Sequence, residues 1–453
     1  MLTTGLVAID ATILATAVPT IVKDLGGFAQ FPWLFSIYLL AQAVTVPVYA
    51  KLADTVGRKP IVLAGIALFL LGSVLCGLAW SMPALIAFRA IQGLGAGAVQ
   101  PMAVTIAGDI YTVVERAKVQ GYLASVWAIS SVVGPTLGGV FSQFLSWRWI
   151  FFVNIPLCVI AAWMLLRQFH ESVEPRRHHV DYLGAGLLTA SLSLLIMAVL
   201  EGGQAWAWNS PASIGSFALG SLLLALFLLA ERRAAEPMLP LWVFSRHLLL
   251  STALVSIGVG AILIGLTSFV PTFLEGALGT TPLVSGLALA ALTIGWPISA
   301  SLSGRLYLRI GFRRTALIGS AIALLGIAVL VVTAASPSVS LVAASCFVAG
   351  LGLGLVATPS LIAAQSSVGW NERGVVTGAN LFSRSIGSAV GVAIFGAVAN
   401  GIFAASGERV PDTATVISAA SAVFLAVGVT AALTVVAVVS MPRTPVHEAS
   451  GTA

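Results

Sequence analysis

The chain has 453 residues, of which 58% are apolar and only 8% are charged, and its formal net charge is +6. Soluble domains carry roughly 25% charged residues, so most of this chain cannot face water. Its basic residues gather in short loops between apolar stretches. The positive charge is therefore explained by the orientation of the chain in a membrane and does not indicate nucleic-acid binding.

Apolar stretches of about 20 residues, the length that an α-helix needs to cross a bilayer, recur along the whole sequence. Strands of a membrane barrel would be short and alternating, whereas these stretches are long and continuous. The sequence therefore predicts an all-α polytopic membrane protein with fourteen spans. In chain order they are about 2–22, 33–52, 60–80, 84–107, 119–141, 149–167, 182–200, 213–230, 248–272, 284–303, 315–334, 340–364, 375–400 and 416–440.

Loop charges set the predicted orientation. With the N-terminus inside, seventeen of the 22 basic residues fall in inner loops, three in outer loops and two within spans. Because basic loops stay in the cytoplasm, both termini are expected there. Two longer inner loops divide the chain into an N-terminal six-helix bundle (1–167), linkers with an inserted helix pair (168–246), a C-terminal six-helix bundle (247–441) and a short tail (442–453).

The first span contains Asp10, within a segment that runs from Ile9 to Pro19. A carboxylate inside a span costs at least a few kcal/mol and is by default a functional-site candidate. We expect Asp10 to bind and release the coupling proton. The alternatives are a structural ion pair and a helix end at the membrane interface.

A short motif after the second span recurs after the tenth. Residues 50–59 and 304–314 share a small residue, Leu, Gly and a terminal basic cluster at matching offsets. Duplicated halves are typical of alternating-access transporters. Asp54 and the basic cluster that follows it can latch one helix to another and part when the helices rock. The alternative is a solvated basic loop, and Leu308 replaces the acidic residue in the second copy.

Two arginines lie within spans, Arg89 in the fourth and Arg384 in the thirteenth. Arginine stays charged, so either can hold a carboxylate or another anion but cannot carry the proton. Arg89 can alternatively snorkel outward. Arg384 is too deep to do so easily, and we predict that Asp10 and Arg384 pair in one conformation and part in the other.

The fifth span contains the run Val133 to Gly139, with sequence VGPTLGG. Proline removes one backbone hydrogen bond, and the glycines let another helix approach closely or slide. A kinked packing helix is the simpler interpretation.

Together these segments resemble the major facilitator superfamily, and specifically its 14-span drug:proton antiporter branch, from Asp10 to about Asn400. The resemblance implies two six-helix bundles around a central cavity, with an inserted helix pair. Three sets of residues match its signatures: the gating loop (Asp54, Gly57, Arg58, Lys59), the exporter helix (Gly134, Pro135, Gly138, Gly139) and the proton-coupling positions (Asp10, Arg89, Arg384). Ala50 and Thr55 depart from the loop signature.

Polar and aromatic residues within the spans are the candidates for the substrate cavity, although many of them can equally pack between helices. Glu275, where the branch often has Gln, can assist proton uptake or cation release, or can simply be solvated. The candidates are Tyr38, Gln42, Trp127, Asn154, Glu275, Trp296, Asn380 and Phe382.

The predicted function is proton-coupled antiport that exports lipophilic or amphiphilic molecules, cationic drugs among them, in the manner of multidrug efflux. The alternatives are export of an endogenous lipid, siderophore, amino acid or other metabolite, and, more distantly, a non-transporting receptor or intramembrane enzyme. Fold alone does not choose the substrate. We expect no enzyme activity, metal, cofactor, ATP or nucleic acid. The expected partners are the substrate, protons and the lipid bilayer, and the protein is expected to be a monomer in the bacterial cell membrane.

Overall fold

A computed structural model describes residues 2–110, 113–169, 181–203, 205–234, 241–369, 372–406 and 412–442. The regular elements in these residues are helices. They divide into two compact units, Met1–Leu239 and Pro240–Ala453.

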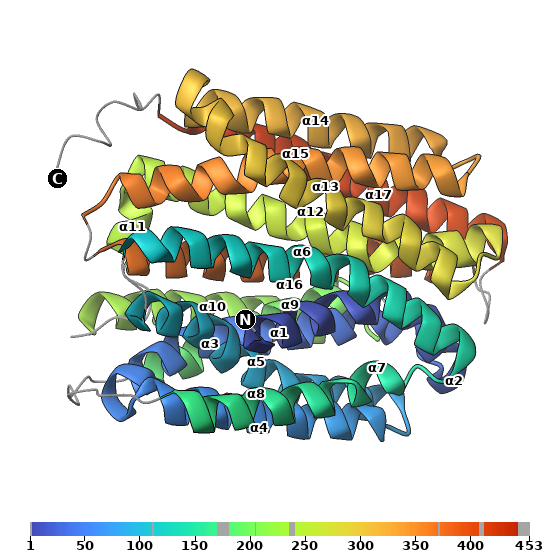
Figure 1. The fold of residues 1–453 in the computed structure, drawn as a ribbon. Coiled ribbons are helices and arrows are strands. Elements are labelled where there is room, and N and C mark those ends of the chain that lie inside the picture. The colour runs from blue at the N-terminus through green and yellow to red at the C-terminus, as the bar shows by residue number, and fades with distance from the viewer. Residues whose placement is uncertain are drawn as a thin grey trace. The chain divides into compact units, whose positions relative to one another are not determined.

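In its described residues, the first unit contains ten α-helices and two 3₁₀ turns, which can be followed in Figure 1. They are α1 (Leu2–Ile13), η1 (Leu14–Thr16), α2 (Val18–Leu25), η2 (Phe28–Gln30), α3 (Phe31–Val56), α4 (Arg58–Gly77), α5 (Met82–Ile110), α6 (Val113–Phe144), α7 (Trp149–Phe152), α8 (Asn154–Gln168), α9 (Tyr182–Glu201) and α10 (Pro211–Arg233).

The second unit contains seven α-helices in the part of the chain that is described. They are α11 (Trp242–Ser245), α12 (His247–Leu278), α13 (Pro282–Ile310), α14 (Phe312–Thr333), α15 (Val339–Ser366), α16 (Arg373–Ser406) and α17 (Thr413–Ser440).

The described residues support about twelve of the spans, and the count of fourteen stays a prediction. Within the described residues, twelve helices are long and apolar enough to cross a membrane, and α1 with α2 makes a thirteenth if this pair, bent by 62°, is one span. The bend follows from Pro19 at the start of α2, which has no N–H for the preceding turn. The expected fifth span, 119–141, coincides with α6, whose first half has mostly undescribed side chains.

The two units repeat one set of helix pairings. In the first, α5 packs on α3 and α4, α1 on α6 and α8, and α4 on α8. In the second, α15 packs on α13 and α14, α12 on α16 and α17, and α14 on α17. The corresponding turns also match, because Gly57 (φ +102°) and Gly311 (φ +88°) each join two consecutive helices in a conformation that favours glycine. These turns lie in the two copies of the repeated motif.

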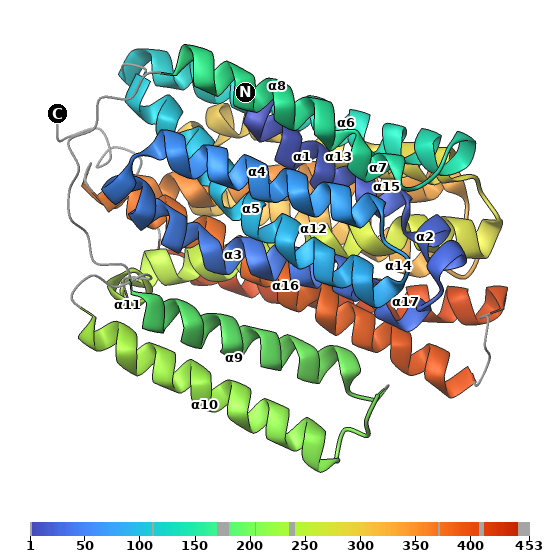
Figure 2. The ribbon, with the colours of Figure 1, turned by 90° about the horizontal axis from the view of Figure 1, so that it is seen from below.

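The inserted helix pair, α9 and α10, lies in the first unit, where the two helices run side by side (Figure 2). α9 packs on α3, and the Trp33 indole N–H donates to Glu201 Oε1 at 2.9 Å. Much of α10 is exposed, including Leu222, Leu226 and Leu229, which suits a helix that faces lipid.

Candidate functional site

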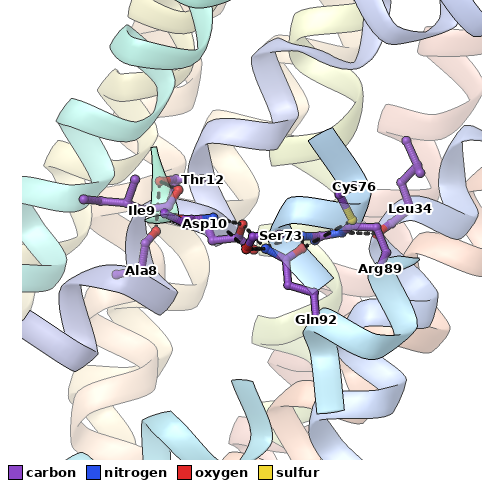
Figure 3. A network of polar contacts seen from close by, with 10 residues as sticks. Ala8, Ile9, Asp10, Thr12, Leu34, Ser73, Cys76, Arg89 and Gln92 are labelled. Atoms are coloured by element: carbon purple, nitrogen blue, oxygen red, sulfur yellow. Dashed lines mark hydrogen bonds and ion pairs between the residues drawn. The ribbon is translucent and has the colours of Figure 1, made fainter. Parts of the chain in front are cut away.

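Asp10 lies at the centre of a buried polar network in the first unit (Figure 3). It stands near the end of α1, and only 1% of its surface is exposed. Side chains from α4, α5 and α8 surround it. An isolated charge could not remain there, so its partners determine what this carboxylate can do.

Arg89 of α5 is the counter-ion of Asp10. Its Nη1 lies 2.9 Å from Asp10 Oδ2, and both side chains are almost fully buried. The same Nη1 donates to Gln92 Oε1 at 2.6 Å, and Nε donates to the Leu34 carbonyl oxygen at 3.2 Å. The guanidinium also lies 4.0 Å from the centre of the Tyr38 ring. Arg89 is therefore held between α3 and α1 and does not extend to a membrane surface.

Two amides hold the other oxygen of Asp10. Gln92 Nε2 and Asn154 Nδ2 donate to Oδ1 at 2.8 and 3.1 Å. Both amides also donate to the Ser73 hydroxyl, at 2.8 and 3.3 Å. Both oxygens of Asp10 are therefore bound, one by its counter-ion and the other by two amides.

Two buried oxygen atoms beside the pair, the Tyr38 hydroxyl and Asn154 Oδ1, have no hydrogen-bond partner among the described residues. Buried polar atoms are nearly always satisfied, so an unsatisfied one calls for an explanation. Here they provide hydrogen-bonding positions that a water molecule next to Asp10 can fill.

The helix with the expected exporter signature, α6, packs directly on the helix that carries Asp10. The Thr12 hydroxyl donates to the Ser130 carbonyl oxygen at 3.2 Å, and the Thr16 hydroxyl donates to the Pro135 carbonyl oxygen at 3.3 Å. A Cβ added at Gly134 or Gly138 would overlap the hydroxyl of Thr12 or Thr16. The glycines therefore set how closely α6 approaches α1, which couples this signature physically to the Asp10 network.

Replacing Gly138 with Val is expected to reduce transport by at least about tenfold and to destabilise the first unit. The new side chain would meet the Ile13 carbonyl oxygen as well as the Thr16 hydroxyl, and overpacking of this kind typically costs about 1–3 kcal/mol. Transport in liposomes and thermal unfolding check both effects. Gly186→Val is the matched control, because a Cβ at Gly186 in α9 meets nothing within 4 Å. Equal effects of the two variants would contradict the packing argument.

The gating loop joins α3 to α4. Gly57 supplies the turn, and Lys59 Nζ donates to the Leu166 and Phe169 carbonyl oxygens at 3.1 and 2.6 Å. Lys59 thus caps the C-terminal end of α8, where a cation is favourable. The side chain of Asp54 lies outside the described residues, so the latch stays a prediction.

Arg384 belongs to the second unit and lies on α16, with its guanidinium 5.8 Å from the centre of the Trp296 ring on α13. The predicted Asp10–Arg384 pair would join the two units and stays a prediction. In this structure both oxygens of Asp10 are bound by residues of the first unit.

The remaining cavity candidates occupy different environments. Tyr38 and Asn154 belong to the Asp10 network, and Gln42 is also buried. Asn380 accepts from the Ser256 hydroxyl at 2.8 Å and is directed at α12. Glu275 accepts from the Ser285 hydroxyl at 2.7 Å, and Trp296 and Phe382 are half-buried. The Trp127 side chain lies outside the described residues.

Sequence comparison places the chain in a family. The sequence profile of the Major Facilitator Superfamily matches residues 1–392. The chain belongs to the major facilitator superfamily. Relatives that resemble the chain in sequence are named as transporters, and the chain is accordingly a multi-pass membrane protein of the transporter type.

Relatives within the superfamily include multidrug transporters. Multidrug resistance protein 3 of Bacillus subtilis (strain 168) is 35% identical, over 87% of this chain and 77% of the relative. Multidrug transporter protein MdtP of the same organism is 34% identical, over 91% of this chain and 77% of the relative. A crystal structure of a bacterial homologue of the human lysosomal transporter Spinster, inward-facing and unoccupied, superimposes with a TM-score of 0.68 at 18% identity, covering 97% and 94% of the two chains.

Sequence reasoning did not select Gln92, Ser73, Thr12 or Thr16 as site residues. Gln92 carried a usable signal, because it lies three residues after Arg89 and so on the same helix face. Ser73 carried none, since serine is common in membrane helices and only the fold brings α4 against α5 and α8.

Proposed function

We propose that the chain is a proton-coupled antiporter that exports lipophilic or amphiphilic small molecules from the cytoplasm by alternating access. Its expected form is a monomer with fourteen spans and both termini cytoplasmic in the cell membrane. The strong basic bias of the loops on one side supports this orientation. Two relatives named as multidrug proteins, at 34 and 35% identity, support the class of cargo.

The observation that carries proton coupling is the buried Asp10–Arg89 pair. Counting α1 to α2 as one bent span, Asp10 is the one carboxylate in the described helices that lies more than five residues from a span end. A membrane-buried acid of this kind is a typical proton carrier. Protonation would remove its charge, and Arg89 and the two amides would then lose the anion that holds them together.

In the proposed cycle, substrate binds from the cytoplasmic side while Asp10 is ionised. The two units then rock so that the site opens outward, Asp10 takes up an external proton, and the substrate leaves. Thermodynamic reciprocity requires that protonation weaken substrate binding by the same factor by which substrate weakens protonation. No nucleotide or metal takes part, because the proton gradient supplies the free energy.

The proposal is tested with the purified chain in liposomes whose lumen is one pH unit more acidic than the outside. A one-for-one antiporter accumulates substrate about tenfold, since one pH unit is worth about 1.4 kcal/mol per proton. Cationic, neutral and anionic amphiphiles are compared, and a dye in the lumen reports substrate-dependent proton release. Accumulation that survives an uncoupler, or that releases no protons, would rule out antiport.

A further inference from the structure

Arg384 is a charged side chain within the helices of the second unit. It lies eleven residues from the start of α16, or roughly 17 Å along the helix axis. Its guanidinium lies against Trp296, which has fourteen residues of α13 on either side of it. The charge therefore lies about three helical turns inside α16 and beside the middle of α13.

No carboxylate of the second unit pairs with Arg384 among the described residues. Glu275 is bonded to Ser285 near the end of α12, Glu372 pairs with Arg246 at 3.5 Å, and Asp412 caps α17. The guanidinium has five N–H donors, and within its unit no described oxygen accepts from any of them. The Trp296 ring offers only a weak cation–π contact in compensation.

The charge balance of the spans leaves Arg384 unmatched. Three charged side chains of the described helices lie more than five residues from a span end, again counting α1 to α2 as one span: Asp10, Arg89 and Arg384. Asp10 and Arg89 neutralise each other at 2.9 Å. One positive charge therefore remains in the membrane interior, where an unpaired cation is costly.

We propose that Arg384 and Trp296 form the binding site for the anionic group of an amphiphilic substrate, such as a carboxylate on an apolar or aromatic body. This inference rests on the proposed export function and specifies its substrate class. The planar guanidinium matches a carboxylate in a bidentate pair. The indole face beside it provides an apolar surface for the body of the molecule. The bound substrate supplies the missing negative charge.

Equilibrium binding to the purified chain in lipid nanodiscs tests the proposal without any gradient. The probes are 5-phenylpentanoate, its primary amide and 5-phenylpentylamine, which differ only in the charge of the head group. The unmodified chain is expected to bind the carboxylate at least about tenfold more tightly than the amide, a difference of about 1.4 kcal/mol. Arg384→Gln is expected to lower carboxylate binding to about the level of amide binding, and so to remove this preference.

Two further variants separate charge from folding. Arg384→Lys keeps the positive charge but lacks the planar guanidinium that can donate two parallel hydrogen bonds to a carboxylate. Part of the preference for the carboxylate probe should therefore remain. Arg305→Gln removes an exposed arginine near the end of α13 and should leave the preference intact. Thermal unfolding verifies that each variant is folded.

Three outcomes would overturn the proposal. The first is equal affinity for all three probes in the unmodified chain, and the second is a preference that survives in Arg384→Gln. The third is competition by inorganic phosphate or chloride as strong as that by the carboxylate probe, which would indicate a site for small anions only. If Arg384→Gln instead shifts the pH dependence of transport and spares head-group selectivity, Arg384 acts on Asp10. Because binding needs no gradient, failure of proton coupling alone leaves these results unaffected.

Discussion

Replacing Asp10 with Asn is expected to abolish proton-driven accumulation of substrate and to leave substrate–substrate exchange across the liposome membrane. Asn has nearly the size of Asp but no titratable group, so exchange can continue without carrying a proton, although with weaker substrate binding because Asn resembles the protonated carboxyl. With a lumen one pH unit more acidic, the accumulation ratio should fall from about ten to about one. The measurement compares gradient-driven uptake with exchange in the same liposomes.

Asp24 provides the matched control for this experiment. It also accepts from an arginine at 2.9 Å, but its side chain is 49% exposed near the end of α2. Asp24→Asn should therefore accumulate substrate normally. Because Asp10→Asn leaves Arg89 without its counter-ion, thermal unfolding must show that the variant is folded. Undiminished accumulation in folded Asp10→Asn would refute the coupling role of this residue.

The helical plan could be predicted from the sequence wherever one apolar run makes one straight helix. The expected spans at 60–80 and 315–334 correspond to α4 and α14, which begin directly after Gly57 and Gly311. The first expected span is different, because hydropathy does not register the loss of a backbone hydrogen bond at Pro19. That run is a pair of helices bent by 62°, which counts as one span only if the two helices are taken together.

The charged members of the site could be predicted individually, because a charge within an apolar run is conspicuous. Their partners could not. Asp10 and Arg89 are 79 positions apart, and only the packing of α1 on α5 places their charges together. Asn154 and Tyr38 were expected in a substrate cavity from their polarity alone. In the structure they contact Asp10 and Arg89, since a polar side chain in a helix does not reveal which neighbour it faces.

The contacts of Asp10 also bear on the charge of the substrate. A single intramembrane carboxylate was expected to favour cationic substrates. Arg89 already neutralises this carboxylate, and Gln92 and Asn154 bind its other oxygen. A cationic substrate would have to compete with a buried guanidinium for Asp10, whereas an anionic one would meet the unmatched charge of Arg384.

Replacing Arg89 with Leu is expected to lower the free energy of unfolding by about 3–5 kcal/mol, because it leaves a buried carboxylate without its counter-ion. Removing both charges, with Asp10→Asn and Arg89→Leu together, should recover much of this loss. Recovery is expected because replacing a buried ion pair as a unit is far less destabilising than breaking it. Titration of the chain in mixed micelles with a denaturing detergent measures the unfolding of the single and double variants.

The Arg148–Asp24 pair shows why burial, and not distance, determines the size of this effect. Its N–O distance is also 2.9 Å, but the two side chains are 35% and 49% exposed. Exposed ion pairs contribute about 0–1 kcal/mol, so Arg148→Leu should cost far less than Arg89→Leu. Similar losses in the two variants would mean that the Asp10–Arg89 pair contributes little, and that Arg89 acts on the fold mainly through the Tyr38 ring and its hydrogen bond to the Leu34 carbonyl oxygen. In that case the double variant would show no recovery, and the Asp10–Arg89 pair would be free to break during transport at little cost to the fold.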